Sequence, residues 1–581
     1  MAVNQERQPL LAGVEENERR NRYDGSGSAT PQSNLNNTPR SDDVEMPPRK
    51  MVITLCITVW VPVFTAALDS TIVATLVGAI SSSFNRNEQA AWLGTSYLLS
   101  VCCFSPIYGR LCDVMGRKYA LLLAMFTFGI GTLLCGIAPT METLLFARVL
   151  AGVGGGGLTT CTSTILSDVI PLRQRGLYQG LTNIVYGAGN ALGGPVGGLL
   201  NDTVGWRNAF LIQIPFLLLA TVLSLFFVHV NPPQPKGKPS SPQQQITRWE
   251  RIKSIDALGS LTLVGSVAPI LLSLSFMSAN DLPFTNPLVW GTLFGGILCG
   301  FAFIWVETRF AKAPILPIDL FLTRTGGNAS LANFFLSVVT HSTIYNYPLY
   351  FQAVRLQSSS LAGLHLVPNS VALSIGSVLA GLWMRKTGRY YWLTFSNSLL
   401  MVVSAIAFLT ITRSTPEWCT YAAIFPHGFG VTGVLTCTLL ALINSVPRTQ
   451  IAVATGMSYL FRTTGQVVGV ATSGVILQAM LKKELQNRLG DQPKLIEDLR
   501  HQLNIIRTLP KVQQEAAKQA YEVSLRAVFA FVLIAAIGCS LSCFMMEDIP
   551  LPDAAPSETP AQSQPNSGTA TPSRRLEEGR Q

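Results

Sequence analysis

Charged residues are scarce in this sequence. Lys, Arg, Asp and Glu make up 13% of the 581 residues, about half their share in an average soluble protein. More than half of these charges fall in four polar segments, residues 1–50, 231–255, 481–523 and 547–581. The rest of the chain could not supply the charged surfaces of several soluble domains. Composition therefore excludes a multi-domain soluble enzyme. It also excludes a nucleic-acid binder, because the net charge of +10 is not collected on a polar domain.

Metal-binding and redox motifs are also missing. Ten of the eleven cysteines lie inside apolar runs, and only Cys112 lies in a polar connection. No CxxC pattern occurs, and the histidines form no pair at the spacing of a metal site. Cysteines in such runs are best interpreted as small buried hydrophobic residues. We therefore expect no metal site and no cofactor.

What the sequence does contain is a series of long apolar runs. A membrane-spanning helix needs about 20 mostly apolar residues, and fourteen segments reach that length. They lie near residues 52–78, 89–108, 119–138, 142–166, 177–200, 208–230, 256–277, 287–306, 329–351, 361–384, 390–411, 417–443, 453–479 and 524–546. A long polar tail precedes the first run, which excludes a cleaved signal peptide. The sequence therefore predicts an all-α polytopic membrane protein with 14 transmembrane spans.

The distribution of Lys and Arg between the connecting loops predicts the orientation. If both termini are cytoplasmic, the short inner loops carry most of these cations and the short outer loops carry four. Residues 481–523 do not fit this distribution, because this outer segment carries eight cations as well as acids. Its Leu and Ile residues between 495 and 506 follow helical spacing, and Pro510 ends the run. This pattern predicts an amphipathic helix that rests on the outer face.

Two connecting loops share one pattern. The first, Gly109–Lys118, follows the second expected span, and the second, Gly381–Arg389, follows the tenth. In both loops two glycines lie seven residues apart and the second glycine is followed by Arg. Two copies of one loop predict two related helical bundles.

The first copy of this loop is a candidate conformational latch. Glycine permits a tight turn between two helices, and an acid can pair with a neighbouring cation or cap a helix end. The latch residues are Gly109, Asp113, Gly116, Arg117 and Lys118. The alternative is a positively charged turn that only fixes the topology, and the second copy, which lacks the acid, fits this alternative better.

The fifth expected span is rich in glycine. Glycines four residues apart clear one face of a helix for close approach by a neighbour, and an internal proline allows bending. The residues concerned are Gly189, Gly193, Gly194, Pro195 and Gly198. We expect this helix to move against its neighbours, and dense static packing is the alternative.

Three charged residues lie deep inside expected spans. They are Asp69 in the first, Arg148 in the fourth and Arg462 in the thirteenth. A carboxylate in the bilayer is costly unless it is paired or faces water, so Asp69 is a functional candidate, with Arg148 as its expected partner. An acid beside a movable cation can change its protonation state as helices rearrange, which proton coupling requires. The alternatives are a fixed structural ion pair and an Asp69 carboxylate held by the hydroxyls of Ser70 and Thr71.

These motifs resemble the major facilitator superfamily, in particular its fourteen-span proton-antiporting branch. The similarity covers about residues 51–546. Leu68–Val73 is similar to the family's first-helix signature, Gly109–Lys118 to its loop between helices two and three, Arg148–Gly157 to its fourth-helix signature and Gly189–Gly198 to its antiporter-type fifth-helix signature. The resemblance implies the major facilitator fold, with two six-helix bundles around a midplane site and two inserted helices.

The resemblance and the polar segments together divide the chain. The tails, 1–50 and 547–581, are expected to be disordered and cytoplasmic, because their composition cannot offset the entropy of ordering. Between them we expect an N-terminal bundle at 51–230, a cytoplasmic linker at 231–255, the inserted pair at 256–306 and a C-terminal bundle at 307–546 that includes a lumenal loop at 481–523.

Two further segments are similar to the fungal vacuolar basic amino acid transporters. They are Ser167–Gly176 and Trp206–Pro215. In the amino-terminal tail, Glu6, Leu10 and Leu11 are similar to acidic dileucine signals that route proteins to vacuoles or lysosomes. We therefore expect a multi-pass protein of the vacuolar membrane with a sorting adaptor as partner, and the plasma membrane is the alternative location.

The resemblance implies a proton-coupled antiporter, not an enzyme. It would move the basic amino acids Lys, Arg and His from the cytosol into the vacuole, with Asp69 also expected to contact the cationic substrate. The expected partners are this small-molecule substrate, protons and the lipid bilayer, without nucleic acid. One alternative is a plasma-membrane multidrug or toxin exporter with proton exchange. Another is a nutrient sensor that transports nothing.

Overall fold

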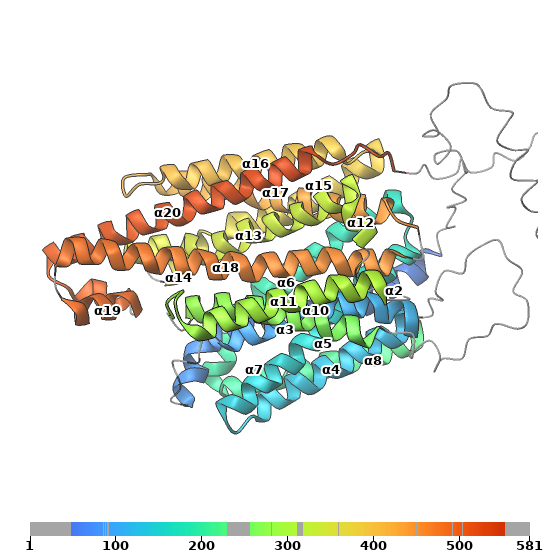
Figure 1. The fold of residues 1–581 in the computed structure, drawn as a ribbon, viewed down its shortest axis with the longest axis horizontal. Helices are drawn as coiled ribbons and strands as arrows, with labels where there is room; N and C mark the ends of the chain where they lie inside the picture. Colours follow the sequence, from blue (N-terminus) through green and yellow to red (C-terminus); the bar gives the residue numbers. More distant parts are fainter. Residues whose placement is uncertain are drawn as a thin grey trace, which may run out of the picture. The chain divides into compact units, whose positions relative to one another are not determined.

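The structure is a computed structural model that describes residues 48–551, except 85, 87–88, 90–91, 229–255, 280–281, 311–315, 317, 358, 448–449, 491 and 502. Every regular element among these residues is a helix, as Figure 1 shows. The described helices all lie within one compact unit of the chain, Val44–Gln581. The expected all-α fold is therefore confirmed. Most of the expected tails and linker, and the tail residues Glu6, Leu10 and Leu11, lie outside the described residues.

The first six expected spans correspond to seven helices, because the sixth span is broken in two. The helices are α2 (Arg49–Ser83), α3 (Trp92–Met115), α4 (Arg117–Ile137), α5 (Met141–Val169), α6 (Leu172–Thr203), α7 (Trp206–Leu211) and α8 (Gln213–Phe227). The break has a local cause, since the nitrogen of Pro215 carries no hydrogen to donate to the carbonyl of Leu211. We call these seven helices the first half.

The inserted pair and the second half follow. The pair is α10 (Ala257–Ala279) and α11 (Pro287–Arg309). The second half contains α12 (Ile318–Leu322), α13 (Arg324–Ala353), α14 (Ser359–Leu364), α15 (Val367–Thr387), α16 (Tyr391–Thr410), α17 (Glu417–Asn444), α18 (Ile451–Leu489), α19 (Pro493–His501), the 3-10 helix η3 (Leu503–Thr508) and α20 (Lys511–Phe544). The break between α14 and α15 has the same cause as the earlier one, because Pro368 cannot donate to the carbonyl of Leu364.

All fourteen expected spans fall on helices of the structure. Within the described residues, twelve helices are long and apolar enough to cross a membrane. The two expected spans that do not meet this criterion are α6 and α13. Both are long enough, with 32 and 30 residues, but they carry more polar side chains. In α13 most of these side chains are buried against other helices rather than turned to lipid. The count of fourteen spans stays a prediction.

Each half has its own apolar core. In the first half, α2, α4 and α5 bury Val59, Phe128 and Leu158 completely. In the second half, α16 and α20 contribute Met401 and Val532 to a cluster that also includes side chains of α13 and α17. The first of these clusters also includes Ala452 of α18, so the two halves touch through buried apolar residues in this conformation.

The two halves meet at the end of the molecule where α3 joins α4 and α15 joins α16. Gly109 of α3 lies so close to α18 that a Cβ there would be 2.7 Å from the carbonyl oxygen of Ala452. At the same end, the hydroxyl of Ser377 on α15 donates to the carbonyl of Gly180 on α6 at 3.1 Å. This is the end that the Lys and Arg bias predicts to be cytoplasmic. We call it the predicted cytoplasmic end, and the opposite end the predicted lumenal end.

Helix α10 lies against both halves. Its Leu263 and Leu271 belong to one buried cluster with Cys102 of α3 and Leu460 of α18. The ring of Phe276 also contacts Trp92 of α3, with 5.5 Å between centroids. The inserted pair therefore covers the line along which α3 and α18 meet.

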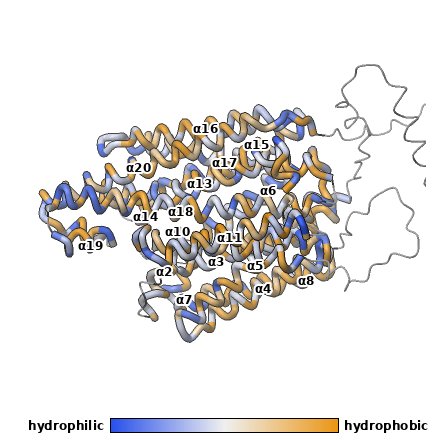
Figure 2. Tube along the Cα trace, in the orientation of Figure 1, coloured by the Kyte–Doolittle hydropathy of each residue, from blue (hydrophilic) through white to orange (hydrophobic). Residues whose placement is uncertain are grey.

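The polar segment 481–523 differs from the expectation of one amphipathic helix on the outer face. Helices α18 and α20 extend into it, and the expected helix is divided into α19 and η3. Its apolar residues Ile496, Leu499 and Ile506 are buried against α18 and α20 instead of facing a membrane surface. Figure 2 shows how hydrophilic this region is beside the hydrophobic helices. The position of Pro510 is as expected, since it precedes the first residue of α20.

Candidate functional site

Asp69 and Arg148 form the deepest ion pair in the described part of the chain. The Nη1 atom of Arg148 on α5 donates to Oδ2 of Asp69 on α2 at 2.7 Å. The side chains are 1% and 0% exposed, respectively. Two opposite charges at this distance in a buried site attract each other strongly, which offsets part of the cost of removing them from water. The pairing expected from the sequence is therefore present in this conformation.

Three other groups complete the surroundings of this pair. The Nε atom of Arg148 donates to the carbonyl of Leu93 at 3.2 Å, and its guanidinium lies 4.4 Å from the centre of the Tyr97 ring. The amide nitrogen of Gln213, at the start of α8, lies 3.4 Å from the second oxygen of Asp69. A cation over an aromatic face is stabilised by the ring quadrupole. The site is thus built from α2, α3, α5 and α8, all in the first half.

The hydroxyls next to Asp69 do not hold its carboxylate. Ser70 donates to the carbonyl of Ala67 at 2.8 Å, and Thr71 to the carbonyl of Leu68 at 3.1 Å. The alternative in which these hydroxyls hold the carboxylate therefore does not describe this conformation. Because Asp69 is completely buried, it is also not accessible to a substrate here, in contrast to the expected substrate contact.

Arg462 is not part of this ion pair. It lies on α18 in the second half, is half-buried, and its guanidinium is 5.6 Å from the centre of the Tyr459 ring. Arg462 is therefore separate from the Asp69–Arg148 pair, although all three residues are charges deep inside expected spans.

The loop after α3 forms a network of charges. Arg117 is 1% exposed, and its Nη1 donates to Asp113 at 3.1 Å and to the carbonyl of Cys112 at 3.0 Å. Its Nε donates to Asp168 at 2.7 Å. The two acids come from the ends of α3 and α5, and Arg117 begins α4. The network therefore ties three helices of the first half together.

The remaining latch residues support this arrangement. Gly116 has a φ of 90°, a conformation that other residues rarely adopt, and it allows the chain to turn from α3 into α4. The Nζ atom of Lys118 donates to the carbonyl of Leu225 near the end of α8 at 2.5 Å. Of the two latch glycines, Gly109 contacts the second half closely, and a Cβ on Gly116 would meet nothing within 4 Å. In the second copy of the loop, Arg389 instead pairs with Asp548 at 3.5 Å near the surface.

The glycines of α6 do not share one environment. A Cβ on Gly193 would lie less than 3 Å from three atoms of α2, and one on Gly189 would lie 2.6 Å from the carbonyl of Phe64. A Cβ on Gly194 would only reach ordinary contact with Thr75, at 3.5 Å, and one on Gly198 would meet nothing within 4 Å. Pro195 is exposed. Of the four glycines expected to clear a face of this helix, Gly189 and Gly193 therefore make the close helix contact, and Gly194 and Gly198 do not.

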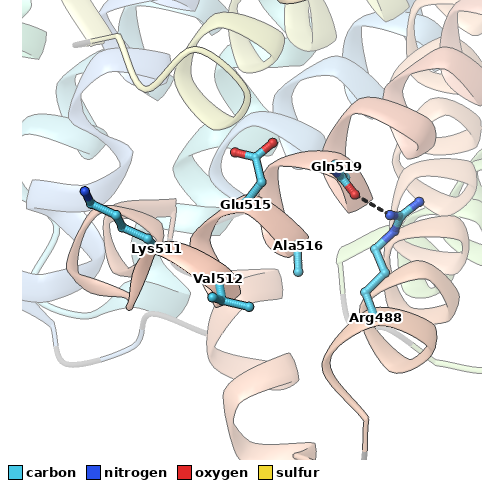
Figure 3. A pocket seen from close by; sticks show the side chains of 6 residues that line it. All are labelled: Arg488, Lys511, Val512, Glu515, Ala516 and Gln519. Carbon is cyan, nitrogen blue, oxygen red and sulfur yellow. Dashed lines mark hydrogen bonds between the residues drawn. The ribbon is translucent and has the colours of Figure 1, made fainter.

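An open groove lies at the predicted lumenal end, between the end of α18 and the start of α20. It has a volume of about 580 Å³ and is lined by Arg488, Lys511, Val512, Glu515, Ala516 and Gln519, as Figure 3 shows. Arg488 donates to Gln519 at 2.6 Å, and Glu515 is paired with Arg413. The groove belongs to the extension of these helices and is not part of the Asp69 site.

Sequence reasoning missed three residues of these sites. Asp168 was inside a motif already noted, and an acid at the end of a span beside a basic loop is a signal that could have identified it. Gln213 was detectable as a single amide in an otherwise apolar run. Tyr97 had no such signal, because its role depends on which face of α3 meets Arg148. Within the described residues, no group of three or more His, Cys, Asp or Glu could hold a metal ion.

Comparison with known proteins identifies the family. The profile of the Major Facilitator Superfamily matches residues 59–470. The chain belongs to this superfamily. It is therefore a multi-pass membrane transporter of small molecules, and the two-bundle fold expected from the sequence is the fold of its family.

Individual relatives in the superfamily carry different names. The chain is 38% identical to the multidrug resistance protein fnx1 of Schizosaccharomyces pombe, over 83% of this chain and 90% of that protein. It is 31% identical to vacuolar basic amino acid transporter 1 of Saccharomyces cerevisiae, over 74% and 78% of the two chains. Among solved structures, the human organic anion transporter MFSD10 has a TM-score of 0.54 at 12% identity, with 84% of this chain and 100% of that chain covered. This last similarity concerns the fold alone.

Proposed function

We propose that this transporter is a proton-coupled antiporter that moves Lys, Arg and His from the cytosol into the vacuole. The observation that carries the proposal is the fully buried ion pair between Asp69 and Arg148 on two facing helices. The name of the Saccharomyces cerevisiae relative supports the substrate class and the membrane.

Proton coupling needs a carboxyl group whose protonation depends on conformation. In this conformation the Asp69 carboxylate has a cationic partner, Arg148, at 2.7 Å. If the ion pair opens during the transport cycle, an unpaired buried carboxylate would cost several kcal/mol, and binding a proton removes that cost. Opening the pair therefore takes up a proton, and closing it releases the proton. In the closed pair, the amide nitrogen of Gln213 lies 3.4 Å from Oδ1 and orients the carboxylate.

The charge network at Arg117 supports a conformational role for the predicted latch. It holds the ends of α3, α4 and α5 as one rigid corner. Gly109, eight residues before Arg117, makes the contact with α18. A rigid corner moves as a unit, so the loss of this contact, together with the contact of α6 with α15, would separate the two halves at the predicted cytoplasmic end.

Uptake into proteoliposomes tests the coupling. We expect labelled lysine to accumulate in the wild type only when a pH gradient is imposed, and the Asp69→Asn variant to lose this uptake when equal amounts of folded protein are reconstituted. The amide retains the shape of the side chain but cannot exchange a proton. The matched control is Glu142→Gln, which removes an exposed acid from the first turn of α5. Gradient-driven uptake by Asp69→Asn at the wild-type rate would contradict the mechanism.

The second candidate is a plasma-membrane multidrug exporter, which the name of the relative fnx1 favours. The same proteoliposomes distinguish the two functions when lysine is replaced by lipophilic cationic drugs. The location of a fluorescently tagged chain gives an independent answer, since the proposed adaptor signal at Glu6, Leu10 and Leu11 predicts the vacuolar rim. A nutrient sensor would reach the membrane normally and show no flux of either class.

A further inference from the structure

Arg175 is a completely buried cation without a carboxylate partner in the described part of the chain. It lies in the first turn of α6 and is 0% exposed. The two other large, fully buried arginines, Arg117 and Arg148, each pair with aspartate. A cation in the first turn of a helix also opposes the helix dipole. The fold therefore maintains a costly charge at this position.

The contacts of Arg175 compensate this charge only in part. Its Nε donates to the hydroxyl of Ser167 at 2.9 Å, and its Nη2 donates to the carbonyl and the hydroxyl of Ser163, both at 3.1 Å. Both serines belong to the last turns of α5, whose carbonyl end carries partial negative charge. Nη1 is buried and has no hydrogen-bond partner. Neutral oxygens do not balance a full positive charge, so the guanidinium keeps a donor for an anion.

Arg175 lies where the two halves meet. It lies on the part of α6 that packs against α15 of the second half. The adjacent residue, Gly176, packs against α15, where an added Cβ would lie 2.7 Å from the side chain of Met384. The guanidinium is covered because the predicted cytoplasmic end is closed.

A row of buried amides continues from Arg175 along the same face of α6. Gln179 and Asn183 follow at intervals of four residues, which places them above one another on the helix. The amide of Gln179 donates to Asn183 at 3.1 Å, and Asn183 donates to Ser377 of α15 at 3.3 Å. The Oε1 atom of Gln179 is buried without a partner. The row is thus a polar strip that the contact between α6 and α15 covers.

We propose that Arg175 binds the α-carboxylate of the amino acid when the predicted cytoplasmic end opens, with Gln179 and Asn183 lining its path toward the centre. This inference rests on the proposed function and specifies which end of the substrate is recognised. A guanidinium can hold a carboxylate through two parallel N–H bonds, a geometry that lysine cannot reproduce. A transporter with this residue distinguishes free amino acids from cations of the same shape without a carboxylate.

The test compares lysine with lysinamide, which differs only in its uncharged carboxamide. In proteoliposomes, we expect the wild type to take up lysine with a KM at least about tenfold lower than that for lysinamide, as a charged hydrogen bond is worth about 1.5–3 kcal/mol. The Arg175→Gln variant should raise the KM for lysine to that for lysinamide and leave the latter unchanged. Arg175→Lys should lie between the two.

Arg309→Gln is the matched control, because it removes an exposed charge from the same end of the molecule. We expect it to retain the discrimination. Equal KM values for the two compounds in the wild type would overturn the proposal without any variant, even if Arg175→Gln failed to fold. Equal losses for both compounds in Arg175→Gln would mean a structural role only, and the proposal would be wrong while the amino acid function stands. Transport of lipophilic drugs but of neither compound would instead refute the proposed function together with this inference.

Discussion

The carboxylate of Asp69 depends on one side chain for its charge balance. Arg148 is its only cationic partner among the described residues, and Gln213 supplies a single, longer contact at 3.4 Å. Breaking a buried ion pair by removing one member leaves the other charged and unpaired, which is more costly than replacing both members. The pair should therefore behave as a unit in stability as well as in transport.

This coupling gives a stability prediction. We expect Arg148→Met to destabilise the folded protein by about 3–5 kcal/mol. The double variant Asp69→Asn/Arg148→Met should recover a large part of this loss, because no unpaired charge remains. Thermal unfolding of the purified variants in detergent measures both the destabilisation by Arg148→Met and its recovery in the double variant. If the two substitutions lower the melting temperature additively, the side chains do not interact in the way the 2.7 Å distance indicates.

The glycines of α6 lie in two different environments. Gly193 faces α2 closely, whereas a Cβ on the neighbouring Gly194 would only reach ordinary contact with Thr75. We expect Gly193→Ala to lower the free energy of unfolding by about 1–3 kcal/mol, because the added methyl group would overlap Thr71 and the carbonyl of Leu68. Gly194→Ala is the control and should fold like the wild type. Equal melting temperatures for the two variants would show that α2 and α6 are not packed this closely.

The helices and the ion pair were predictable from the sequence for different reasons. Long apolar runs have few alternatives to a membrane helix, so α3, α4 and α16 follow from composition alone. Asp69 and Arg148 were identified because each is the isolated charge of its span. The face that each α6 glycine presents was not predictable, since it depends on where α2 lies. Arg175 looked like one more cation of a basic loop, and only the folded chain reveals that it is buried.

At the scale of the whole molecule, the halves are in contact at one end in this conformation. The sulfur of Cys102 on α3 lies 3.0 Å from the hydroxyl oxygen of Thr464 on α18. We expect the Thr464→Cys variant to form a disulfide with Cys102 under mild oxidation and to lose uptake until a reductant is added. Turnover requires the halves to separate along this line. The variant Thr464→Cys/Cys102→Ala should be insensitive to the oxidant, and equal inhibition of both variants would contradict the prediction.

The position of α10 against α3 and α18 also determines whether a solute can enter the transporter from the lipid. Lipid tails surround a transporter of this kind, and a hydrophobic compound dissolved in them could enter laterally between two helices of opposite halves. On this side the gap is shielded by the contact of Phe276 with Trp92 and by the cluster around Leu263. Helix α11 adds a further apolar layer, with Phe294 and Phe301 exposed on its surface. On this side of the molecule, a solute therefore cannot pass from the lipid between α3 and α18. It has to enter through an aqueous opening, which suits a water-soluble amino acid better than a membrane-soluble drug.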